Sequence, residues 1–152
     1  VAANLLGQDL PVQAAAGLAG IAGHNWSPYM RFTGGRGVAT AVGVVLGFQM
    51  WPECIIIGLM LGVFGYLIFR ESGLWTFIAI LVLPLLAYIF DRESVAIVMT
   101  LVLGTLLIVK RLTANWEMPS GQYPFFHTIA CRILWDRDVP RQLDWTSRRP
   151  MP

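Results

Sequence analysis

The sequence has little charge. Only 13% of its 152 residues are charged, whereas 56% are hydrophobic. An average soluble domain carries about 25% charged residues. The shortage excludes an ordinary soluble domain and indicates an integral membrane protein. Positive charge is scarcest early in the chain, because Lys110 is the only lysine and seven of the eleven basic residues lie at or after it.

Residues for metal binding and covalent catalysis are also few. Two cysteines, Cys54 and Cys131, do not make a disulfide framework. The acidic residues lack ligand spacing with histidine or cysteine, so we predict no metal site and no cofactor. No pair of nucleophile and base stands out, so any catalysis is expected to be non-covalent. We expect no nucleic-acid partner.

What the sequence does contain is a series of apolar segments. They cover residues 12–23, 38–50, 54–69, 74–90 and 94–109, with a short one at 1–7. Segments 38–50 and 54–69 are together too long for one span of about 20 residues. We therefore expect two short, closely joined helices there, with Trp51 as an interfacial anchor. Pro84 is compatible with a membrane helix, since neighbouring groups satisfy the freed carbonyl.

The segments predict an all-α, polytopic membrane helix bundle over residues 1–112. The chain begins with Val1 and shows no signal peptide, so we expect an N-terminal truncation, with 1–7 ending an upstream helix. Residues 113–152 form a polar tail. Within it, residues 125–135 predict a short amphipathic helix on the inner leaflet; a loosely ordered tail is the alternative.

Alternating spans sort the loops by charge. One side receives the loops with Arg31, Arg36 and Arg70 and the end of the last span, while the other receives the acidic loops. The excess of basic residues on the first side places it, and the tail, in the cytoplasm by the positive-inside rule.

The most distinctive stretch, residues 23–40, reads GHNWSPYMRFTGGRGVAT. Glycines let backbone N–H groups approach an anion, and the start of a helix carries partial positive charge. An arginine adds a planar fork suited to phosphate oxygens. The stretch therefore predicts an anion site, with a flexible loop between two helices as the alternative. The residues of the site are Gly34, Gly35, Arg36, Gly37, Val38 and Thr40.

Two polar features accompany this loop. His24 is suited to proton transfer near neutral pH, although a lone histidine is more often a hydrogen-bonding residue at a helix end. Arg70 and Ser72 form a second polar patch on the same side. Arg70 has an equally simple interpretation as a positive-inside anchor.

The long loop motif resembles the second motif of the bacterial acyl-phosphate:glycerol-3-phosphate acyltransferases, the PlsY family, which reads roughly GHxFPxFxxFxGGKGVAT. Residues 70–74, with a proline downstream, resemble the third motif more weakly, and Arg111, Leu112 and Glu117 are similar to the C-terminal ending. The resemblance covers about residues 1–117.

The resemblance implies a multi-pass enzyme of the bacterial inner membrane that acts as a monomer, with its active site facing the cytoplasm. Such an acyltransferase (EC 2.3.1 class) moves a fatty acyl group from acyl phosphate to the 1-hydroxyl of glycerol 3-phosphate. The products, lysophosphatidic acid and phosphate, belong to phospholipid synthesis. The glycine loop would hold acyl phosphate, and His24 and Arg36 would be catalytic. Candidate contacts to glycerol 3-phosphate are Asn25, Arg31, Arg70 and Ser72.

The chain also departs from the family pattern. Arg36 replaces the lysine of the second motif, Gly73 replaces a serine of the third, and the first motif would lie upstream of Val1. Thr105 and Ile108 stand where a histidine and an asparagine are expected. The alternatives are therefore a degenerate relative that binds lipid phosphate without catalysis, or a small transport subunit. The latter would favour repeats or charges at mid-membrane, and neither is seen in the sequence.

Overall fold

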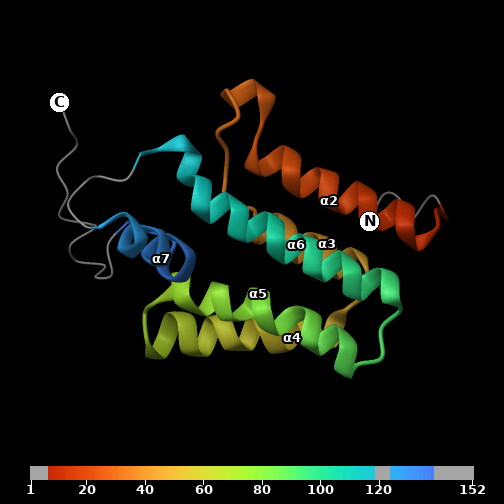
Figure 1. The fold of residues 1–152 in the computed structure, drawn as a ribbon. Coiled ribbons are helices and arrows are strands. Elements are labelled where there is room, and N and C mark those ends of the chain that lie inside the picture. The colour runs from red at the N-terminus through yellow and green to blue at the C-terminus, as the bar shows by residue number, and fades with distance from the viewer. Residues whose placement is uncertain (1–6, 119–123, 139–152) are drawn as a thin grey trace.

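A computed structural model describes residues 7–118 and 124–138, and in these residues the regular elements are helices (Figure 1). The predicted all-α membrane helix bundle is confirmed. Most of the predicted helix end at 1–7 lies outside the described residues. The longer helices are α2 (Leu10–Asn25), α3 (Val38–Gly47), α4 (Trp51–Leu59), α5 (Ser72–Ile89), α6 (Ser94–Thr113) and α7 (Phe125–Trp135).

Three helical stretches are long and apolar enough to cross a membrane. These are Trp51–Ile68, Ser72–Ile89 and Ser94–Trp116. In contrast, α3 has 10 residues, a length of about 15 Å against a hydrocarbon core of about 30 Å. The expectation of two short helices is therefore wrong for the second one, since α4 continues directly into η2 (Met60–Ile68), a π-helical stretch.

The residues expected to separate these two helices instead begin α4. Pro52 lies in the first turn, where its missing N–H leaves no hydrogen bond unmade. Glu53, expected in an acidic loop, is fully buried and accepts two hydrogen bonds from Arg92, at 2.7 and 2.9 Å. The connection between α3 and α4 is only residues 48–50.

Successive helices run in alternating directions, so the loops gather at two ends of the bundle (Figure 1). The pair of Glu53 and Arg92 lies at one end. The loop before α3, the turn before α5, the end of α6 and α7 lie at the other end, as the contact of Arg137 with Glu71 also shows. This grouping agrees with the one predicted from the charge pattern.

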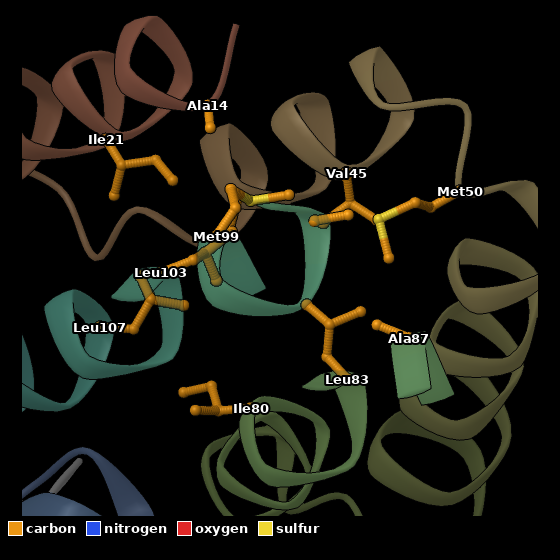
Figure 2. Close-up of a cluster of buried hydrophobic side chains, with 12 residues drawn as sticks. Ala14, Ile21, Val45, Met50, Ile80, Leu83, Ala87, Met99, Leu103 and Leu107 are labelled. Carbon is orange, nitrogen blue, oxygen red and sulfur yellow. The ribbon is translucent and has the colours of Figure 1, made fainter. Parts of the chain in front are cut away.

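The core forms where α6 packs against α2, α3 and α5. Figure 2 shows Ile21, Val45, Leu83 and Met99 from these four helices converging on one apolar cluster. At Gly104 of α6, an added Cβ would lie 3.0 Å from the side chain of Ile80. Small residues allow such close helix approach in membrane proteins. Because the cluster includes Val45, this packing also holds α3 against the rest of the bundle.

The tail contains the predicted helix, since α7 spans Phe125–Trp135. The alternative of a loosely ordered tail is therefore wrong for these residues. Arg111 of α6 donates to the carbonyl of Ile133 at 2.6 Å and to that of Gly73 at 3.0 Å, which fastens α7 to α5 and α6. This docking places the C-terminal end of α7 beside the loop that precedes α3 (Figure 1).

Candidate functional site

The glycine loop, defined as residues 26–37, joins α2 to α3. A short 3-10 turn, η1 (Pro28–Met30), and a bridge between Ser27 and Thr33 fold it back on itself. Gly37 lies at the N-cap of α3 with φ 73°, a conformation that glycine adopts without steric penalty. No side chain caps this helix start, so its first N–H groups remain available to an anion.

The loop glycines lie directly against the end of α2. A Cβ on Gly34 would clash with the carbonyl oxygens of His24 and Asn25, and one on Gly35 would clash with the imidazole of His24. A Cβ on Gly37 would clash with the amide of Asn25. The loop glycines therefore allow the loop to lie against the end of α2. The same packing brings the predicted residues His24 and Asn25, at the end of α2, into contact with the loop.

Asn25 has an unusual environment for a polar side chain. It is fully buried, and neither atom of its amide has a hydrogen-bond partner among the described residues. An unsatisfied buried amide costs about 1–3 kcal/mol. This amide lies against Gly37. It therefore places an unpaired hydrogen-bonding group beside the start of α3.

Lys110 of α6 stabilises the position of the loop through hydrogen bonds. The residue is 1% exposed, and its ammonium donates to the carbonyl of Asn25 and to Oδ1 of Asn115, the latter at 2.7 Å. The same Oδ1 accepts the backbone N–H of Gly34 at 3.3 Å. The ammonium also lies 5.5 Å from the ring centre of Trp26, within cation–π range. Lysine and asparagine thus hold the loop to the end of α6.

A polar pocket of about 200 Å³ opens beside Arg36. Its arginines are Arg36, Arg111, Arg132 and Arg137, and its acidic residues are Glu117, Asp136 and Asp138. Arg36 forms an ion pair with Asp136, the residue that follows α7. Burial raises the pKa of Asp136, while the charges of Arg36 and Arg111 act in the opposite direction.

An apolar groove of about 110 Å³ begins at Val38, the first residue after the loop. Val38 lines its loop end, Ala41 and Val45 continue along α3, and side chains from α4, α5 and α6 complete it. Glu53 lines the opposite end. Figure 2 shows Val45 and Leu83 facing one another across this region. The end of the loop therefore lines a polar pocket at Arg36, and the start of α3 lines an apolar groove at Val38.

The other predicted residues are placed as follows. Thr40 is partly buried in the first turn of α3, and Arg31 is exposed in the left-handed conformation with φ 53°. Arg70 and Ser72 line a separate hollow with Gly65 and do not line the pocket at Arg36. Among residues 7–118 and 124–138, no group of acidic, histidine and cysteine side chains could hold a metal ion.

The sequence does not predict three residues that contact the loop or the residue before it. Lys110 is predicted only as part of the positive charge at the cytoplasmic end of the last span, although it stands out as the only lysine. Asn115 and Asp136 carried no local signal. Both have positive φ, 57° and 58°, and reach the loop from 81 and 100 residues away in the sequence.

Comparison with known proteins places this site in context. The family described as "Glycerol-3-phosphate acyltransferase" matches residues 1–117. Glycerol-3-phosphate acyltransferase 4 of Dehalococcoides mccartyi (strain CBDB1) is 32% identical over 152 residues, covering 96% of this chain and 64% of the relative. The glycerol-3-phosphate acyltransferase of Pseudomonas fluorescens is 40% identical over 114 residues, covering 74% and 57%. This chain thus spans less than two thirds of these relatives. No solved structure matches it.

Proposed function

Because this chain belongs to the glycerol-3-phosphate acyltransferase family, we propose that the protein containing it moves a fatty acyl group from acyl phosphate to the 1-hydroxyl of glycerol 3-phosphate. The products are lysophosphatidic acid and phosphate, and the reaction serves phospholipid synthesis. The glycine loop faces the cytoplasm from the bacterial inner membrane, which agrees with the positive charge gathered at its end of the bundle.

One observation carries this proposal: a polar pocket and an apolar groove are lined by residues only two positions apart, where the glycine loop joins α3. Arg36 lines the pocket and Val38, two residues later, lines the groove. Two residues span at most about 7 Å of chain. Acyl phosphate has the same division, with a charged phosphate joined directly to an apolar chain. A ligand with its phosphate at Arg36 has its chain at the mouth of the groove.

The residues of the loop suit the chemistry of this transfer. The N–H groups at the start of α3 and the guanidinium of Arg36 bind the phosphate and stabilise the charge that it gains on leaving. The glycerol hydroxyl attacks the acyl carbon, forming a new C–O bond as the bond to the phosphate oxygen breaks. His24, whose ring touches Gly35, takes the hydroxyl proton.

The acceptor is bound by other groups in this proposal. The amide of Asn25 faces the loop, and Arg31 adds charge from the exposed surface of the loop. Arg70 and Ser72 add charge and hydrogen bonds from the separate hollow that they line at the same end of the bundle. Thr105 does not add to them, because its hydroxyl donates to the carbonyl of Leu101 in its own helix at 2.9 Å.

Phosphate release tests the proposal. The full-length protein is purified in detergent, and release from acyl phosphate is measured with and without glycerol 3-phosphate. We expect release only with the acceptor, and one lysophosphatidic acid for each phosphate. Arg36→Ala should lower the rate by at least tenfold, as loss of one charge-stabilising donor does elsewhere. Binding of acyl phosphate without turnover under any condition would instead identify a non-catalytic relative.

A further inference from the structure

The ion pair between Arg36 and Asp136 joins the loop to a segment outside the matched family region. That region ends at residue 117, while Asp136 follows α7 directly. The two charged groups are 100 residues apart in sequence. Arg36 is also the arginine to which the phosphate of the donor is assigned above. A carboxylate from the tail therefore occupies Nη1 of the guanidinium that the proposed substrate needs.

The structure holds this carboxylate in place rather than presenting it on a loose chain. The carbonyl of Ile133 accepts a hydrogen bond from Arg111, and the carbonyl of Trp135 lies directly against Gly73. On the other side of Asp136, the guanidinium of Arg137 donates to both carboxylate oxygens of Glu71, at 2.9 and 2.8 Å. Anchors before and after Asp136 thus fix its position at the loop.

Carboxylates and phosphates bind arginine in the same way. Both present two oxygens to the planar fork of the guanidinium, in one or two charge-assisted hydrogen bonds. A guanidinium engaged by one anion cannot offer the same N–H groups to another. An incoming phosphate must therefore displace Asp136 from Arg36 or bind with one strong contact fewer.

We propose that Asp136 is a resident competitor for phosphate at Arg36 and thereby sets the apparent affinity of the loop for the donor, a proposal that rests on the assignment of the donor phosphate to this loop. Asp136 is part of neither the reacting groups nor the acyl groove. Its removal changes donor binding and leaves the chemical step unchanged.

Two substitutions remove the carboxylate without disturbing the backbone. Asp136 has φ 58°, a left-handed conformation that asparagine and glycine both tolerate. Asp136→Asn and Asp136→Gly therefore keep the turn after α7. Asp91→Asn is the matched control, because Asp91 also has positive φ, 51°, and is exposed at the opposite end of the bundle.

The test is a calorimetric titration, in which inorganic phosphate is added to the full-length protein in detergent and the heat of binding is measured. A partly exposed ion pair is worth at most about 1 kcal/mol, so removing the competitor should tighten phosphate binding about fivefold. Both variants of Asp136 should show this gain, and Asp91→Asn should match the unchanged protein. In the acyl transfer assay, the donor KM should fall by the same factor at constant kcat, a split that a purely structural role would not produce.

The possible failures are distinguishable. If Arg36→Ala abolishes phosphate binding while both variants of Asp136 bind phosphate no tighter than the unchanged protein, the competitor role is refuted and the loop assignment stands. A lower melting temperature without tighter binding likewise shows that Asp136 only stabilises α7. If Arg36→Ala leaves phosphate binding unchanged, the phosphate does not bind at this loop, and both proposals fall.

Discussion

Substituting alanine for each of three glycines distinguishes the effect on stability from the effect on activity. Two of these glycines lie in the loop, and the third, in α3, is the control. A Cβ on Gly34 would meet backbone atoms, including the carbonyl oxygen of Asn25 at 2.8 Å. The three atoms nearest to a Cβ on Gly35 all belong to the ring of His24, with its Cε1 at 2.9 Å and its Cδ2 at 3.1 Å. A Cβ on Gly43, in α3, would meet nothing within 4 Å. The same substitution thus meets backbone, a side chain or open space.

The expected effects follow from what must move. Backbone at the end of α2 cannot yield easily, so Gly34→Ala should cost about 1–3 kcal/mol of stability, as overpacking does. The ring of His24 can turn away, so Gly35→Ala should change stability little. It displaces a proposed catalytic group by an ångström or so, which lowers kcat/KM by about 10- to 100-fold. Gly43→Ala should stabilise α3 by up to about 1 kcal/mol.

Two measurements on each variant test this reasoning: the melting temperature in detergent and kcat/KM for acyl transfer. Gly34→Ala should lower the melting temperature, Gly35→Ala should lower only kcat/KM, and Gly43→Ala should lower neither. Full activity in Gly35→Ala would refute the role of His24 at the loop. Equal loss of stability in Gly34→Ala and Gly35→Ala would refute the distinction between backbone and side-chain contacts.

Three further predictions concern the supports of the site. Lys110→Met removes a buried ammonium with two hydrogen bonds and should cost about 1.5–3 kcal/mol per bond to a charged group, measured by the melting temperature; an unchanged value would exclude Lys110 as a fastener. Arg92→Met leaves buried Glu53 unpaired and should cost about 3–5 kcal/mol, whereas the double variant with Glu53→Leu should recover most of that loss. If the double variant is no more stable than Arg92→Met, loss of the ion pair with Glu53 is not the cause of the lost stability. Ala41→Leu narrows the apolar groove, so kcat/KM should fall more for long-chain than for short-chain acyl phosphates; equal losses would show that the chain lies elsewhere.

Much of the fold was predictable because membrane helices follow from local composition. The apolar segment at 12–23 lies within α2 (Leu10–Asn25), and the tail helix was predicted with its observed bounds. The error fell at residues 51–53, where tryptophan, proline and glutamate resemble a loop. Glu53 is buried there with its carboxylate paired to Arg92, 39 residues later. A local pattern cannot contain such a distant partner.

The residues of the site that lie in one local motif were also predictable, but the contacts between them were not. Its glycines and Arg36 stand out in one continuous motif, and the structure brings His24 and Asn25 to them. The sequence explained those glycines by ligand approach, whereas the structure adds their contact with the end of α2. That contact depends on how the loop folds back, which no spacing of residues in the chain reveals.

The balance of charge around the loop determines how strongly Asp136 can compete. Lys110 lies beneath the loop and shares Oδ1 of Asn115 with the N–H of Gly34, and Arg111 acts on Asp136 together with Arg36. Arg132 and Arg137 are paired with other carboxylates, Asp138 and Glu71. Asp136 therefore faces Arg36 and Arg111 and neutralises only part of their field. A phosphate with up to two negative charges gains more from that field than the carboxylate does. Asp136 should consequently weaken phosphate binding without preventing it, which is why a gain of only about fivefold is expected when its charge is removed.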